Sequence, residues 1–88
     1  SNEVRVKNSL IDLTNREYAI LEYLIRNKGR LLSKGMIAEH VWDFHFDGDY
    51  NIIEVYIRRL RNKIEKDGVA RIIHTVRNGG YVIREPEG

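Results

Sequence analysis

Four basic side chains, Arg58, Arg59, Arg61 and Lys63, occur within a stretch of six residues. The guanidinium group of arginine is a planar fork that can bind guanine O6 and N7 together or bind a phosphate, and lysine adds a mobile point charge. This combination has the chemistry needed to bind a nucleic acid. A charged helix face is more often only solvated, so the neighbouring sequence has to decide between these two interpretations.

The segment Asn51–Lys66, which contains these side chains, is predicted to form one amphipathic helix. Its apolar residues recur at the i, i+4, i+7 and i+11 spacing of a single helix face; they are Ile53, Ile57, Leu60 and Ile64. Roughly opposite this stripe, a solvent-facing ridge is predicted from Ile52, Val55, Tyr56, Arg59 and Lys63, with Arg58 and Arg61 on its flanks. Arginines and small apolar groups on an outer face are typical of a helix that enters the DNA major groove, where apolar groups can contact thymine methyls.

The positive charge of the chain is concentrated in and after this helix. Residues 1–50 carry seven Lys and Arg against eight Asp and Glu, whereas residues 51–77 carry seven against three. The net charge of the whole chain is only +2. A localised positive field of this kind is what binding to a phosphate backbone requires.

Composition and motifs exclude several classes of function. The chain has no cysteine, so a disulfide framework and a thiolate zinc site are excluded. His40, His45 and His74 lack the spacing of a zinc signature, and residues 43–50 lack the ligand order of a calcium loop. Neither a glycine-rich phosphate loop nor a G-x-S-x-G elbow is present, so we expect no enzyme activity and no cofactor. No apolar run approaches a membrane span and no signal peptide opens the chain, which fits a cytoplasmic protein.

At the start of the chain, a hairpin and a helix are predicted. Alternating apolar residues predict strands at 3–7 and 10–13. The spacing of Thr14 and Glu17 is that of a capping box, which starts a helix, and Gly29 supplies the left-handed residue that ends it. The apolar face of this helix is expected to comprise Tyr18, Leu21, Leu24 and Ile25.

A second, shorter helix is predicted to begin after Ser33, an N-cap residue, and to reach Trp42. The loop that follows, residues 43–50, interleaves acidic and aromatic side chains. Phe44 and Phe46 either pack on the second helix or form an exposed docking surface for a protein partner. The residue pattern alone leaves both interpretations open.

A second hairpin is predicted after the long helix. Ile72–Val76 and Tyr81–Arg84 read as strands joined by a glycine-rich turn, with Arg77 at the tip. A solvated turn residue is one interpretation of this arginine; a wing that reaches into a minor groove is the other. Within the long helix, Glu54 is expected to pair with Arg58 one turn later.

The resulting order of hairpin, helix, helix, loop, basic helix and hairpin is that of a winged helix-turn-helix, an α+β fold with three helices. The residues also resemble the C-terminal DNA-binding effector domains of OmpR/PhoB-type bacterial response regulators. The matching stretches cover nearly the whole chain; they are LTNREYAILEYL at Leu13–Leu24, LLSKGMIAEHVWD at Leu31–Asp43, NIIEVYIRRLRNKI at Asn51–Ile64 and IIHTVRNGGYVI at Ile72–Ile83. The IRRLR segment followed by TVRNGGY at this spacing is highly specific for that family.

This resemblance implies sequence-specific binding to double-stranded promoter DNA and regulation of transcription, as the output of a two-component regulatory system. Helix 51–66 would read the major groove and the wing at 72–84 the minor groove. Direct-repeat sites would be bound by two copies in a head-to-tail pair. The implied partners also include RNA polymerase, a receiver domain in cis and a sensor histidine kinase, with phosphorelay signal transduction upstream and no membrane.

The resemblance also assigns roles to individual residues. Arg59 would be the main base-contacting arginine, Val55 an apolar base contact, Thr75 a phosphate contact and Arg77 the arginine of the minor groove. Ile52 stands where some members have a polar reader. The implied DNA-binding set is Asn51, Ile52, Val55, Tyr56, Arg58, Arg59, Arg61, Lys63, Thr75 and Arg77. The implied polymerase-contact loop is Asp43, Phe44, His45, Phe46 and Asp47.

We expect residues 1–88 to be a single domain cut from a longer protein. The chain begins with Ser1, no receiver domain is present, and only the last two strands of the family's N-terminal sheet of about four strands find room. Two alternatives stay open. The basic helix could bind an acidic protein partner in a winged-helix interaction module, or the domain could belong to a membrane-anchored one-component regulator.

Overall fold

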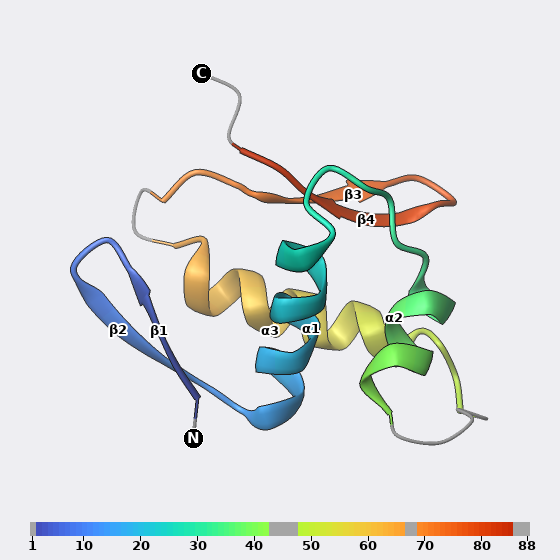
Figure 1. Cartoon of the computed structure of the whole chain (residues 1–88), viewed down its shortest axis with the longest axis horizontal. Helices are drawn as coiled ribbons and strands as arrows, with labels where there is room; N and C mark the ends of the chain where they lie inside the picture. Colours follow the sequence, from blue (N-terminus) through green and yellow to red (C-terminus); the bar gives the residue numbers. More distant parts are fainter. Residues whose placement is uncertain (1, 43–47, 67–68, 86–88) are drawn as a thin grey trace.

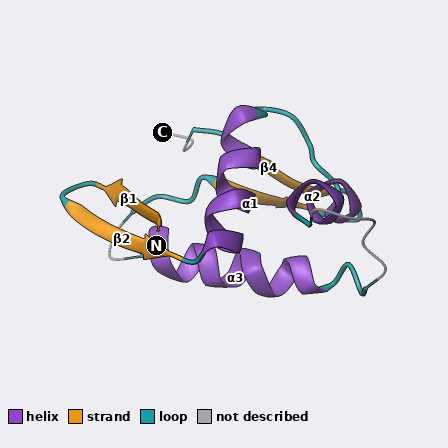
Figure 2. Cartoon of the chain, turned by 60° about the horizontal axis from the view of Figure 1, so that its bottom comes forward, coloured by secondary structure: helices purple, strands orange, loops and turns teal. Residues whose placement is uncertain are grey.

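The computed structural model describes residues 2–42, 48–66 and 69–85. Its elements are, in chain order, β1 (Asn2–Val6), β2 (Ser9–Leu13), α1 (Asn15–Arg26), α2 (Lys34–Val41), α3 (Ile52–Ile64), β3 (Ile73–Val76) and β4 (Gly80–Ile83). In Figures 1 and 2, α1 crosses α3 steeply, while α2 lies near the start of α3 and the β1–β2 hairpin near its end. The predicted order of three helices between two hairpins is confirmed. None of the described helices is long and apolar enough to cross a membrane.

The starts of α1 and α2 follow the predicted capping chemistry. The Thr14 hydroxyl accepts a hydrogen bond from the Glu17 amide at 3.2 Å, and the Glu17 carboxylate accepts one from the Thr14 amide at 2.9 Å. Ser33 caps α2 by accepting from the Met36 amide at 3.0 Å. At the end of α1 the predicted glycine cap was wrong: the C-cap is Asn27, whose amide donates to the last carbonyls of the helix. Gly29 is left-handed, with φ +86°, but it lies in the turn beyond the cap.

The two hairpins form separate two-stranded antiparallel sheets. In β1–β2 the register runs from Asn2 opposite Leu13 to Val6 opposite Ser9. In β3–β4, which corresponds to the predicted wing, Ile73 lies opposite Ile83. An isolated hairpin is only marginally stable, so each one depends on the helices it packs against.

The connection between α1 and α2 holds the wing in place from one side. Leu32 and Tyr81 exchange backbone hydrogen bonds of 2.8 and 2.9 Å, and the Gly29 amide donates to the Ile83 carbonyl at 2.9 Å. Gly80 makes this approach possible: it has φ +125°, and a Cβ there would lie 2.1 Å from the Leu32 carbonyl oxygen. The glycine is therefore required where the wing meets the connection.

The apolar stripe of α3 forms the centre of the core, as predicted. It packs with side chains from all the other helices, both hairpins and the α1–α2 connection; the buried apolar residues include Leu13, Ile20, Leu21, Leu24, Leu32, Ile37, Ile53, Ile57, Leu60, Ile64, Ile73, Tyr81 and Ile83. The predicted apolar face of α1 was wrong at one position, because Ile25 is 54% exposed and Ile20 is buried instead. The buried stripe of α1 runs through Glu17, which places Ile25 beyond its edge near the helix end.

Glu17 is a charged residue in this apolar environment, at 1% exposure. Its carboxylate accepts a hydrogen bond from the Lys63 ammonium at 2.6 Å, and Lys63 also donates to the Asp12 carbonyl at 3.3 Å. Burial by itself raises the pKa of Glu17, but the hydrogen bonds from Lys63 and Thr14 and the charge of Lys63 outweigh it and lower the net pKa. A buried carboxylate is tolerated only with such partners, so the pair joins the start of α1 to the end of α3.

We predict that Glu17→Gln lowers the free energy of unfolding by about 1–3 kcal/mol at neutral pH, because a charged hydrogen-bond partner is removed from a buried site. Folding lowers the pKa of Glu17, so its stabilisation is present at neutral pH and is lost as the pH falls below the ordinary value of 4.5. Urea unfolding at about pH 7 and about pH 3 should therefore show the difference from wild type shrinking in acid.

Glu22→Gln is the matched control, because Glu22 lies on the same helix in an exposed pair with Arg26 at 3.6 Å. Exposed pairs of this kind contribute about 0.5 kcal/mol or less. Equal losses for the two substitutions, or a Glu17→Gln effect that does not change with pH, would contradict this account.

Candidate nucleic-acid interface

The outer face of α3 is less uniform than the predicted solvent-facing ridge. Ile52 and Arg59 are exposed, whereas Val55, Tyr56 and Lys63 are half-buried. The prediction took each side chain to point straight outward from the helix axis. Long side chains on the flanks instead bend toward neighbouring elements, where they find apolar or charged partners.

One flank of α3 faces α1 and the end of α2. Here the Lys63 ammonium contacts Glu17, as described above. The Tyr56 ring packs edge-on against Trp42, with centroids 6.1 Å apart, and the Arg59 guanidinium carbon lies 5.4 Å from the Tyr56 centroid. Two of the predicted DNA-binding side chains, Tyr56 and Lys63, therefore have partners within the domain.

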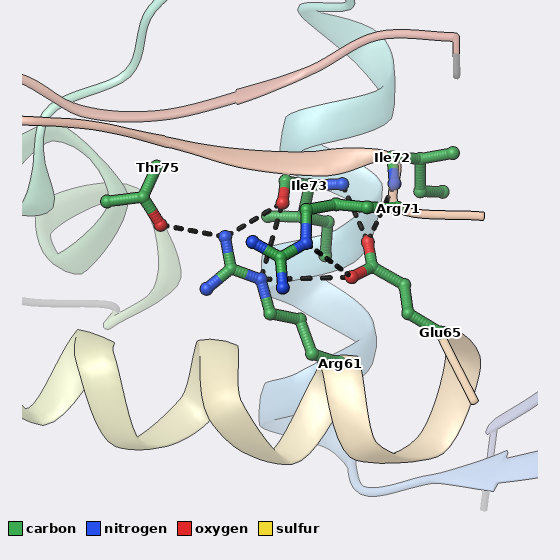
Figure 3. A network of polar contacts seen from close by, with 6 residues as sticks. All are labelled: Arg61, Glu65, Arg71, Ile72, Ile73 and Thr75. Atoms are coloured by element: carbon green, nitrogen blue, oxygen red, sulfur yellow. Dashed lines mark hydrogen bonds and ion pairs between the residues drawn. The ribbon is translucent and has the colours of Figure 1, made fainter. Parts of the chain in front are cut away.

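The other flank faces the wing, and Arg61 connects the two elements (Figure 3). Its guanidinium donates to the Ile73 carbonyl at 2.8 and 3.3 Å and to the Thr75 hydroxyl at 2.8 Å. Burial, together with the nearby positive charge of Arg71, lowers the pKa of Arg61, which stays protonated at neutral pH. Arg61 thus fixes the position of the first wing strand relative to α3.

Glu65, at the end of α3, was not identified from the sequence. Its carboxylate accepts hydrogen bonds from the Ile72 and Ile73 amides at 2.9 and 2.7 Å, and lies 3.8 Å from Arg61 Nε and 4.0 Å from Arg71 Nε (Figure 3). A carboxylate at a helix C-terminus is electrostatically unfavourable, and these four donors offset that cost. The i, i+4 spacing from Arg61 was the one sequence signal that could have indicated it.

The start of α3 is joined to α2 through Lys34. The Lys34 ammonium binds the Glu54 carboxylate and donates to the Asn51 side-chain oxygen at 3.3 Å. The expected pairing of Glu54 with Arg58 was therefore wrong: the partner comes from another helix. The hydrogen bond to Glu54 is the main cause that raises the pKa of Lys34.

A groove of ≈ 870 Å³ lies between α3, the start of α2 and the wing. Of the predicted DNA-binding residues, it brings together Arg58, Arg61, Thr75 and Arg77. Arg71 and Lys34 add two further cations to its lining, and the two groove acids Glu54 and Glu65 are both paired. The groove walls therefore carry an excess of positive charge.

The remaining predicted residues lie outside this groove or outside the described ranges. Four of them belong to α3 or to its N-cap but do not line the groove: Asn51, Ile52, Val55 and Arg59. The predicted polymerase-contact loop, Asp43, Phe44, His45, Phe46 and Asp47, lies outside the described residues. Among the described residues, no group of three or more His, Cys, Asp or Glu is placed to hold a metal ion.

The chain is similar to a family of regulatory domains and to known regulatory proteins. The family model described as "Transcriptional regulatory protein, C terminal" matches residues 7–83. The chain is 41% identical over 88 residues to the transcriptional regulatory protein CusR of Escherichia coli K12, and 48% identical over 85 residues to the response regulator MprA of Mycobacterium tuberculosis H37Rv. These matches take in 100% and 97% of this chain but only 39% and 37% of those proteins, so the chain spans about two fifths of their length.

Among solved structures, the DNA-binding domain of the response regulator AdeR in complex with an intercistronic region is similar, with a TM-score of 0.82 and 25% identity. The likeness covers 96% of this chain and 86% of that one. The winged helix-turn-helix predicted from the sequence is confirmed by this agreement of fold.

We predict that Glu65→Ala lowers the free energy of unfolding by about 2–4 kcal/mol, because two backbone amides and Arg61 lose a buried acceptor. Hydrogen exchange should accelerate first at the Ile72 and Ile73 amides, which donate to this carboxylate. The control is Glu85→Ala, which removes an exposed pair with Lys28 and should leave these amides unchanged. Uniform acceleration over all elements would argue against a local anchoring role.

Proposed function

The chain belongs to the family of OmpR/PhoB-type C-terminal domains of transcriptional regulatory proteins, and from this premise we propose that it binds double-stranded DNA sequence-specifically and regulates transcription as the output domain of a response regulator. The observation that carries the proposal is the basic groove, because side chains of α3 and of the wing meet in it. A groove bordered by Arg58, Arg71 and Arg77 has the charge needed to hold a phosphate backbone.

In the proposed complex, α3 lies in the major groove and the wing in the minor groove. Arg59 is exposed in the middle of α3 and is the proposed base reader, with Ile52 and Val55 as apolar contacts and Asn51 at the helix start. Arg77, exposed at the wing turn, is the proposed minor-groove contact. Phosphates held between these two elements would set the register on the duplex.

The contacts within the domain divide the basic residues of the proposed DNA-binding set into two groups. Arg58, Arg59 and Arg77 are the proposed direct contacts. Arg61 holds the wing and donates a hydrogen bond to the Thr75 hydroxyl, while Lys63 neutralises Glu17. Both basic side chains are half-buried. We propose that Arg61 and Lys63 act mainly by positioning α3, and that Thr75 donates its hydroxyl hydrogen to a phosphate while its oxygen accepts from Arg61.

The whole protein has further proposed parts and partners. Residues 1–88 form the effector domain, to which a receiver domain is joined in cis and a sensor histidine kinase supplies the phosphoryl group. Two copies bind direct repeats head to tail, RNA polymerase is the proposed partner of the loop 43–47, and the setting is cytoplasmic. The domain itself performs no catalysis in this proposal.

The direct test is selection from a randomised duplex pool by the 88-residue chain, followed by sequencing and by binding measurements at two salt concentrations. We expect an enriched direct repeat with half-sites about one helical turn apart. Affinity should fall steeply with salt, because bound phosphates release counterions. If no sequence is enriched and binding disappears at physiological salt, the proposal fails, and an acidic protein partner becomes the better candidate for the basic helix.

Arg59→Ala should lower discrimination between the selected duplex and random DNA by about 1–3 kcal/mol, because one base-edge contact is lost. Arg58→Ala should weaken both duplexes alike, since a phosphate contact carries no sequence information. Arg26→Ala is the matched control, because it removes the same charge from an exposed site on α1. Fluorescence anisotropy with both duplexes measures all three, and equal losses for Arg59→Ala on the two duplexes would remove its assignment as a reader.

A further inference from the structure

Four side chains from three helical segments form a continuous series of contacts that ends at the exposed Arg59. The Arg16 guanidinium carbon lies 4.1 Å from the centroid of the Trp42 ring. Trp42 meets Tyr56 edge-on, with centroids 6.1 Å apart and ring planes at 74°. The Tyr56 ring in turn lies 5.4 Å from the Arg59 guanidinium carbon. We call these four residues the aromatic series.

Arg16 has an unusual position for a cation, in the first turn of α1, where the helix dipole disfavours positive charge. Its side chain leaves that helix end and donates to the Val41 carbonyl at 3.2 Å, at the C-terminal end of α2. Helix C-terminal carbonyls lack intrahelical donors and favour cations. Arg16 therefore binds both the last turn of α2 and the face of the Trp42 ring that follows it.

Trp42 is held on several sides. Its amide donates to the Ala38 carbonyl at 3.0 Å as the C-cap of α2, Arg16 covers its ring, and the residue is half-buried. The edge contact with Tyr56 then fixes how the Tyr56 ring stands on the flank of α3. A fixed Tyr56 offers one face to Arg59, whose side chain is otherwise exposed and has many rotamers.

We propose that Trp42, held by Arg16, is a positioning residue that orients Arg59 for base reading through the Tyr56 ring. The proposal rests on the proposed function of Arg59 and adds a residue outside the predicted DNA-binding set. Ordering a flexible side chain before binding reduces the entropy lost on binding, so the base contact made by Arg59 becomes stronger. The series should therefore act on discrimination between DNA sequences more than on general affinity.

The first test compares binding of the selected duplex and of random DNA by Trp42→Leu, Trp42→Phe and Arg16→Met variants of the 88-residue chain. An exposed cation–π contact corresponds to a change of about two- to fivefold, so Trp42→Leu should lower the affinity ratio by about that factor. Trp42→Phe keeps an aromatic ring and should restore part of the ratio. Urea unfolding of each variant confirms that the compared samples are folded.

Tyr23→Leu is the matched control. Tyr23 is also a half-buried aromatic residue between α1 and α2, and its ring stacks on His40 with centroids 3.8 Å apart, so it does not belong to the aromatic series. This substitution should leave the affinity ratio unchanged. A loss of the same size for Tyr23→Leu, or equal losses on both duplexes for Trp42→Leu, would overturn the proposal in favour of a general structural role.

A double-mutant cycle tests whether Trp42 acts through Arg59. In an Arg59→Ala background, Trp42→Leu should cause no further loss of discrimination, because the side chain that it positions is gone. A loss as large as in the wild-type background would mean that Trp42 acts on DNA by itself, and would overturn the proposal.

A measurement without DNA separates this proposal from the proposed function. NMR relaxation of the Arg59 Nε–Hε group in the free chain should show greater mobility in Trp42→Leu than in wild type, with no change in Tyr23→Leu. Unchanged mobility overturns the positioning role even if DNA is bound selectively. Increased mobility in a chain that shows no sequence preference supports the positioning role and places the failure in the proposed function.

Discussion

Burial of the apolar stripe of α3 is the constraint on which the rest of the structure depends. Ile53, Ile57, Leu60 and Ile64 are all buried, and burying each such side chain is worth about 1.5–3 kcal/mol. Turning the helix by one residue would place an arginine or a glutamate in the core, at a larger cost. The rotation of α3 about its axis is therefore fixed, and with it the set of side chains that face away from the core.

Two polar clusters, one on each flank of α3, fix the positions of α1 and of the wing relative to this helix. Glu17 and Lys63 tie the end of α3 to the start of α1, while Glu65 and Arg61 tie it to the wing. Buried ion pairs add little net stability compared with well-packed apolar groups, but breaking one by removing a single partner is costly. Their effect here is to hold the helix and the wing in one relative arrangement, with the groove between them.

The charges of the chain divide according to whether they are used inside the domain or left at the groove and the exposed face of α3. Glu54 and Glu65, the acids of the groove lining, are neutralised by Lys34 and Arg61. Arg58 and Arg77 remain exposed beside the groove, and Arg59 is exposed along the helix. This division explains how a chain with a net charge of only +2 can present a positive surface where the proposed DNA contacts lie.

The sequence by itself determined the elements, their order and the buried face of α3, because N-caps and helical periodicity act within a few residues of the chain. Only the tertiary structure decided which side chains join α3 and its neighbouring elements to one another. Lys63 and Glu17 are 46 positions apart, and Arg16 reaches Val41 across 25 positions. Such partners leave no periodic signal, so Lys34 went unidentified and the half-buried side chains of Tyr56 and Lys63 were placed on the outer ridge. For Glu65 the sequence offered only the i, i+4 spacing from Arg61, which does not reveal its bonds to the wing. A helical wheel gives the direction in which a side chain leaves its helix, but only the packed neighbours decide where a long side chain ends.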